Sequence, residues 1–156
     1  MKNCTFCLVV LCVSLTFVRC SKSTTTTLPS YNMSATLEKS QTYSWFSAAG
    51  VGYVTALQTK QACVISGTQM SGSSPSAKFT ITISNYTGIG GYDIDGTANV
   101  GDYETINSAF TQTEFISGSL SIISVSGENV YGMFNGVLGD GTVVSSGKFT
   151  ALGTGF

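Results

Sequence analysis

The chain has 156 residues, a formal net charge of −1 and no histidine. This length suits one ordinary domain, and an apolar content of 42% excludes a disordered chain. Seven basic residues against eight acidic ones form no basic cluster for phosphate groups, which argues against nucleic-acid binding. The lack of histidine removes the commonest general base and the commonest metal ligand. We therefore expect neither enzyme activity nor a cofactor.

Residues 1–19 have the pattern of a signal peptide. Lys2 provides a positive charge, and residues 4–18 contain no charged side chain. Fifteen helical residues span about 22 Å, which is less than the hydrocarbon core of a bilayer at about 30 Å. This length is typical of the apolar segment of a signal peptide and too short for a transmembrane helix.

Cys20 follows this segment directly, and residues 20–30 form a polar stretch rich in Thr and Ser. The arrangement resembles the precursor of a bacterial lipoprotein, whose cysteine becomes the first residue of the mature chain and carries acyl groups. The resemblance implies that lipid on Cys20 anchors the protein at a membrane outside the cytoplasm, in a Gram-negative envelope. Arg19 stands where such signals prefer a small residue, so an ordinary signal peptide and a secreted soluble protein are the alternative.

Residues 31–156 are expected to fold, and alternation of apolar and polar residues dominates this range. Phe79, Ile81 and Ile83 alternate with threonines, as in a half-buried strand. Shorter strands are expected at about 33–38, 43–47, 51–57 and 62–67. No segment has a convincing helical pattern, because even the best candidate is rich in Gly, Val, Ser and Thr, which are weak helix formers.

Turn signals divide the C-terminal half into longer strands. The adjacent Ile122 and Ile123 predict a bulge or a strand buried on both faces, and residues 126–129 predict a turn. Asp140-Gly141 predicts a hairpin between strands near 134–138 and 143–150. About eight to ten strands joined by such turns predict a single all-β domain, either an antiparallel β-sandwich or a small β-barrel.

The pattern at 118–149 contains Gly-x-Leu-x-Ile, then Val-x-Gly-x-Phe, then Gly-x-Phe. With the stretch 81–92, it resembles a module of small all-β extracytoplasmic bacterial lipoproteins of uncharacterised function. The resemblance implies a fold and an envelope location, and it brings no catalytic residue. In Val130-x-Gly132-x-Phe134, the missing side chain of Gly132 is expected to let an aromatic ring lie across the backbone or to let the strand bend sharply.

Tyr43, Trp45 and Tyr53 are the candidate ligand-binding residues. They cluster near the start of the domain, and exposed rings on a sheet stack on sugars or partner proteins. Alternation along a strand would place Trp45 and Phe46 on opposite faces, one in the core and one outside. We expect a ligand- or partner-binding domain for a protein or glycan. The alternatives are a structural or assembly component of the cell envelope and a secreted carbohydrate-binding module.

Asp93, Asp95 and Glu104 match the first, third and twelfth positions of a calcium-binding loop. The sixth position, which requires glycine, is Ala98, and the flanking segments have the pattern of strands. These residues are therefore only a weak calcium candidate. The favoured interpretation is a solvated acidic strand face that ends in a turn at Gly96.

Cys63 lies between apolar residues, and we interpret it as a small buried side chain. If Cys20 is not acylated and is retained, a Cys20–Cys63 disulfide is the alternative in an oxidising compartment.

Metabolic labelling with a fatty-acid analogue tests the anchor. We expect label on the wild-type protein and none on Cys20→Ala, because acylation requires the Cys20 thiol. Each buried methylene of an attached chain adds about 0.8 kcal/mol to membrane binding. Cys63→Ala is the matched control and should keep the label. An unlabelled wild-type protein would exclude the lipid anchor.

Overall fold

The computed structural model describes residues 30–50, 52–106 and 110–156. Within these ranges the chain forms ten strands and no helix, so the predicted all-β class is confirmed. The same ranges contain no helix long and apolar enough to cross a membrane. The predicted signal peptide and Cys20 lie outside the described residues. The strands are β1 (Asn32–Lys39), β2 (Thr42–Ala49), β3 (Val54–Gln58), β4 (Cys63–Ser71), β5 (Ser74–Ile83), β6 (Gly90–Ile94), β7 (Asn99–Thr105), β8 (Thr111–Ser126), β9 (Asn129–Leu138) and β10 (Val143–Thr154).

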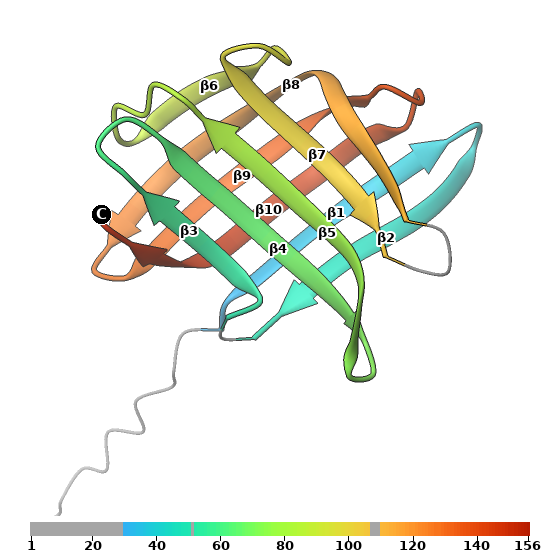
Figure 1. Ribbon diagram of the computed structural model, residues 1–156, viewed down its shortest axis with the longest axis horizontal. Coiled ribbons are helices and arrows are strands. Elements are labelled where there is room, and N and C mark those ends of the chain that lie inside the picture. The colour runs from blue at the N-terminus through green and yellow to red at the C-terminus, as the bar shows by residue number, and fades with distance from the viewer. Residues whose placement is uncertain (1–29, 51, 107–109) are drawn as a thin grey trace, which may run out of the picture.

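Seven strands close into a barrel in the order β3-β4-β5-β7-β8-β9-β10, with β10 pairing back to β3. The closure decides between the two predicted architectures in favour of the barrel. The hairpin of β1 and β2 adds to β10, and β6 adds to β8. All pairings are antiparallel except that of β10 with β3, which joins Leu152–Thr154 to Thr55–Leu57 in parallel. Figure 1 shows β3, β4, β5 and β7 as a front layer that crosses a rear layer containing β8, β9, β10 and β1.

Phe79 of β5 lies at the centre of the core between these layers. Its ring centroid is 4.8 Å from that of Phe46 in β2 and 4.7 Å from that of Tyr103 in β7. It is also 5.4 Å from the ring of Phe134 in β9 and 6.1 Å from the ring of Phe115 in β8. These edge-on and tilted contacts are the geometries that aromatic rings favour. Rings from both layers therefore meet on one side chain.

Short turns connect β1 to β2 and β9 to β10. Ser40 and Gln41 connect β1 to β2 with φ angles of 50° and 64°. Positive φ at both central residues is the type I′ geometry, which matches the twist of a two-residue hairpin. Asp140-Gly141 connects β9 to β10 as expected, and a register shift after Ile122 confirms the predicted bulge in β8.

Gly132 in β9 has the predicted structural role. Its cross-strand partner in β10 is Phe149, whose ring lies over the glycine. A Cβ atom at this position would overlap both that ring and the backbone oxygen of Ser121 in β8. The prediction of an aromatic ring across the glycine backbone is therefore confirmed.

Gly132→Ala is expected to lower the free energy of unfolding by at least about 2 kcal/mol, because the new methyl group overpacks a site closed by backbone. Urea unfolding of the mature protein measures this. Gly91→Ala is the matched control, since Gly91 lies in strand β6 and an added Cβ would meet nothing within 4 Å. Equal midpoints for the two variants would contradict the assignment.

Candidate functional site

The β1–β2 hairpin places two of the predicted aromatic residues on the outer sheet face. Phe46 is buried, whereas its neighbour Trp45 keeps 72% of its surface exposed, so the predicted split is confirmed. Tyr43 lies on the same outer face and is 56% exposed. Its cross-strand partner in β1 is Glu38, and a hydrogen bond with that carboxylate raises the pKa of Tyr43.

Tyr53 lies apart from these two residues. It belongs to the turn before β3, where its backbone N–H donates to the carbonyl oxygen of Gly50 at 3.3 Å. Its carbonyl oxygen accepts a hydrogen bond of 2.8 Å from Thr68 N–H in β4. The ring is 42% exposed and lies beside Gly50. The structure thus brings together Tyr43 and Trp45 but not Tyr53.

A groove of about 490 Å³ lies beside Trp45, and we name it the Trp45 groove. Strands β1, β2, β9 and β10 form it, and its lining combines one exposed indole, four hydroxyl side chains and a single charged residue. The lining residues are Ser34, Ala35, Thr36, Trp45, Phe46, Ser47, Met133, Ser146 and Lys148.

A bulge in β10 shapes this groove. Ser34 of β1 pairs with Lys148 and Thr36 pairs with Ser145, so Ser146 is an extra residue on β10. Its φ of 53° lies in the left-handed region, which costs a residue with a side chain about 1–2 kcal/mol. Bulges bend a strand and redirect its side chains. Sequence reasoning missed Ser146 and Lys148, and the only signal was the Ser-Ser-Gly break in the alternation of this strand.

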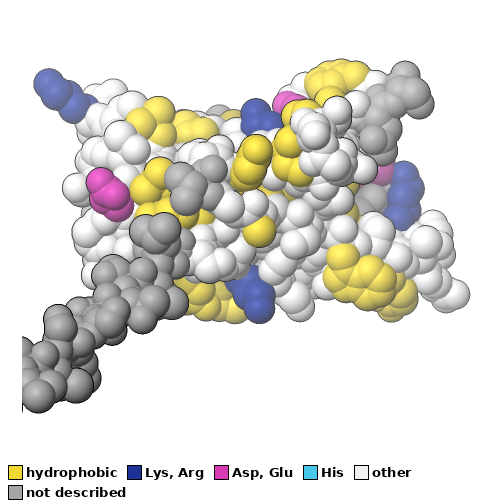
Figure 2. Space-filling model, turned by 90° about the horizontal axis from the view of Figure 1, so that it is seen from below, with side chains coloured by type: hydrophobic (Ala, Val, Ile, Leu, Met, Phe, Trp, Pro, Cys, Tyr) yellow, Lys and Arg dark blue, Asp and Glu magenta, His cyan; other side chains and the backbone are white. Residues whose placement is uncertain are grey.

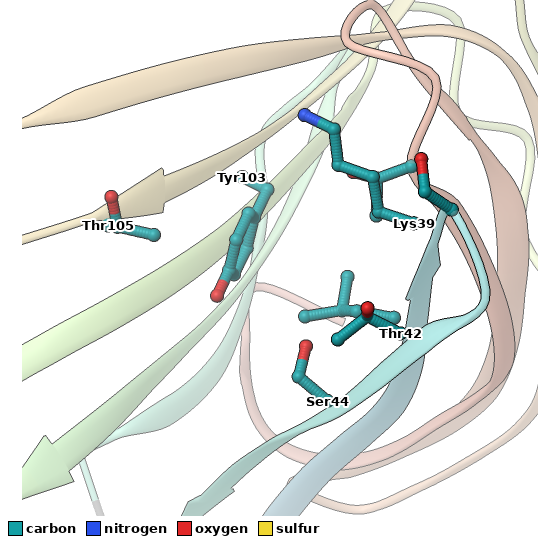
Figure 3. Close-up of a pocket in the computed structure, with 8 residues that line it drawn as sticks. Lys39, Thr42, Ser44, Tyr103 and Thr105 are labelled. Atoms are coloured by element: carbon teal, nitrogen blue, oxygen red, sulfur yellow. The ribbon is translucent and has the colours of Figure 1, made fainter.

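A second hollow of about 480 Å³, which we name the barrel-mouth cavity, opens between the β1–β2 hairpin and β7. Figure 3 shows Tyr103 of β7 across from Thr42 and Ser44 of β2. Burial raises the pKa of Tyr103, so its phenol stays neutral. The remaining lining residues are Leu37, Lys39, Ser40, Thr105 and Thr142.

An ion pair neutralises the charge at the rim of the barrel-mouth cavity. Lys39 Nζ lies 2.7 Å from Oδ2 of Asp140, and this hydrogen bond lowers the pKa of Asp140 to about 2. The contact holds the β1–β2 turn against the β9–β10 turn. The cavity is therefore a neutral, hydroxyl-lined space.

The three acids of the predicted calcium loop do not converge. Oδ1 of Asp95 accepts backbone hydrogen bonds from the following turn, including those of Thr97 at 2.9 Å and Asn99 at 3.2 Å, which lower its pKa. Asp93 is exposed on β6. Glu104 lies near the C-terminal end of β7, the strand that begins at Asn99. No group of three His, Cys, Asp or Glu among the described residues is arranged to hold a metal ion. This geometry is that of the acidic face ending in a turn.

Cys63 is fully buried in β4, as the interpretation of its apolar neighbours predicts. Burial raises the pKa of its thiol to about 12. The thiolate is the nucleophilic form of cysteine, so this side chain is inert near neutral pH.

Three carboxylates, those of Asp102, Glu104 and Glu114, lie close together on β7 and β8, a grouping that sequence reasoning missed. Asp102 pairs across the strands with Thr80 and Glu114, and Glu104 follows it on the same face. Oδ1 of Asp102 is buried and has no hydrogen-bond partner among the described residues. Burial and then the charge of Glu104 raise the pKa of Asp102 to about 6, against the opposing effect of Lys78. Ionisation of Asp102 therefore opposes folding.

One face of the molecule is mostly uncharged. Figure 2 shows hydrophobic side chains in separate patches among polar ones, with few Lys, Asp or Glu side chains between them.

Searches of protein-family models, curated proteins and solved structures found no match to this chain. The chemistry of the Trp45 groove is thus defined by its own geometry: a flat ring, hydroxyl groups and one cation.

Asp102→Asn is expected to raise the melting temperature by a few degrees at pH 7–8. A carboxyl group whose pKa is higher in the folded state stabilises the fold while it is protonated, and that stability is lost as pH rises from about 4 through about 6. The gain should therefore shrink toward zero below pH 4. Melting curves across this range test it, with Asp93→Asn as the exposed-carboxylate control. A gain that is the same at pH 4 and pH 8 would refute the electrostatic cause.

Proposed function

We propose that this chain is a non-enzymatic glycan-binding domain, displayed outside the cytoplasm, on which sugar rings stack against Trp45. The observation that carries the proposal is the 72% exposure of this indole beside a groove lined with hydroxyl groups. A sugar ring has an apolar C–H face and a hydroxylated edge. The first matches the flat ring of tryptophan, and the second matches the serine and threonine side chains.

The groove is built on strands, which favours binding at low entropic cost. Thr36 is the cross-strand partner of Trp45, and Ser34 is the cross-strand partner of Ser47. Their backbones are held by the ladder between β1 and β2, so a ligand orders few additional groups. Phe46, the next residue after Trp45, is locked in the core against Phe79 and keeps the strand face fixed.

Several features support binding without turnover. The chain has no histidine, and its described cysteine, Cys63, is buried with a raised pKa. Asp102, whose pKa is raised toward neutrality, lies on β7, and that strand contributes no residue to the Trp45 groove. With lipid on Cys20 and the tether at 20–30, the proposed location is the Gram-negative envelope. Secretion as a soluble module is the alternative.

One observation favours a role in envelope assembly as a second candidate. Strand β2 lies at the end of the sheet and, within the described part of the chain, pairs only with β1. Its other edge therefore offers backbone groups for an added strand. The side chain of Gln69 covers part of this edge, because its Oε1 accepts a 2.9 Å hydrogen bond from Ser47 N–H. The edge is therefore less open than the Trp45 groove.

A glycan array probed with the mature protein tests the proposed function. We expect Trp45→Ala to weaken binding at least tenfold, equivalent to about 1.4 kcal/mol, because it removes the stacking surface. Ile89→Ala is the control, since Ile89 is similarly exposed at 64% and does not line the groove.

Two outcomes would argue against glycan binding. One is an array without any bound glycan, and the other is binding that Trp45→Ala leaves intact. A stable envelope complex recovered by crosslinking, with no glycan bound, would favour the assembly role.

A further inference from the structure

Among the residues that the structure describes, Lys148 is the one charged residue that lines the Trp45 groove. Its cross-strand partners are Ser34 in β1 and Met133 in β9, so no carboxylate lies directly opposite it. The ion pair found among the described residues joins Lys39 to Asp140 and does not involve Lys148. The ammonium group is exposed and available to a ligand.

The outward-facing neighbours of Lys148 are also uncharged. Along each adjacent strand, the next positions on this face carry hydroxyl, amide or phenol groups. These positions are Asn32 and Thr36 in β1 and Tyr131 and Asn135 in β9. A positive charge is thus isolated within a polar, uncharged surface.

The spacing between Trp45 and Lys148 suits a ligand of two linked rings. Ser34 pairs with both Ser47 and Lys148, so Trp45 lies two strands across and two residues along from the lysine. At about 4.8 Å per strand and 3.4 Å per residue, the two Cα atoms are about 12 Å apart. Both side chains line the Trp45 groove, so one ligand longer than a single sugar ring can contact both.

The charge of the rest of the domain makes this site selective. From residue 20 onward the chain has five lysines and eight carboxylates, a net charge of −3. A negative surface disfavours general adsorption of anions, so an anionic ligand is held only where a local cation faces it. In the Trp45 groove that cation is Lys148.

We propose that the Trp45 groove selects acidic glycans, with one ring stacked on Trp45 and the carboxylate of a neighbouring sugar paired with Lys148. This inference rests on the proposed function and adds the charge of the ligand to it. Because the ammonium group is exposed, the pair contributes modestly, and the expected preference over a neutral analogue is roughly two- to fivefold. The preference weakens as salt concentration rises.

Calorimetric titration with paired ligands tests the inference. The probes are a panel of uronic-acid oligosaccharides and their methyl esters, which have the same rings without the charge. We expect the wild-type protein to bind the acids roughly two- to fivefold more tightly than the esters. Lys148→Met should abolish this difference and leave ester binding unchanged, whereas Lys148→Arg should retain it. Lys60→Met is the charge-matched control, because Lys60 lies in the turn between β3 and β4.

The outcomes separate the inference from the proposed function. Equal binding of acids and esters, or a preference that Lys148→Met leaves intact, would overturn the selectivity while glycan binding stands. Binding of polyglutamate as tight as that of the acids and insensitive to Trp45→Ala would reduce the site to a charge contact and also overturn the inference. Absence of binding to every glycan, acidic or neutral, would overturn the proposed function and the inference together.

Discussion

The contacts of the Phe79 ring are the constraint on which the rest of the structure depends. This side chain of the front layer meets Phe46, Tyr103, Phe115 and Phe134, which come from four other strands. Because Phe46 is held against Phe79, the β1–β2 hairpin cannot rotate about its own axis. The residue before Phe46 in the chain must then point outward. The exposure of Trp45 is in this sense a consequence of core packing on the opposite face of the same strand.

The same packing determines where the outer face is hollow. The backbone oxygen and the ring of Phe134 lie so close to Gly147 that no Cβ atom would fit at that position. Next to this glycine, β10 carries its extra residue, Ser146, with a positive φ angle. The close contact of Gly147 with Phe134 and the bulge at Ser146 therefore occur at adjacent residues of β10. The shape of the Trp45 groove is therefore a consequence of how side chains pack in the core.

Local pattern predicted a large part of this fold, and long-range pairing explains what it missed. Alternation identified strands such as β1 and β5 and the opposite orientations of Trp45 and Phe46, and turn residues such as Asp140 identified a hairpin. It missed β7 and the first half of β8, which begins at Thr111. Closure of the barrel has no local signal, since it depends on which distant strands meet. Lys148 is an isolated surface lysine in the sequence and becomes part of a groove only when four strands assemble. Conversely, Asp93, Asp95 and Glu104 are close in sequence, but the turn after Asp95 and the length of β7 separate them.

The parallel pairing of β10 with β3 also affects the timing of folding. Leu152–Thr154 must reach Thr55–Leu57 before the barrel closes, and these segments lie near opposite ends of the folded sequence. Contacts of this kind are slow to form, because the loss of chain entropy precedes any gain from pairing. During synthesis, the early strands remain without a closing partner until β10 has been made. Until then, the edges of β3 and β9 that β10 will cover are open to pairing with other chains.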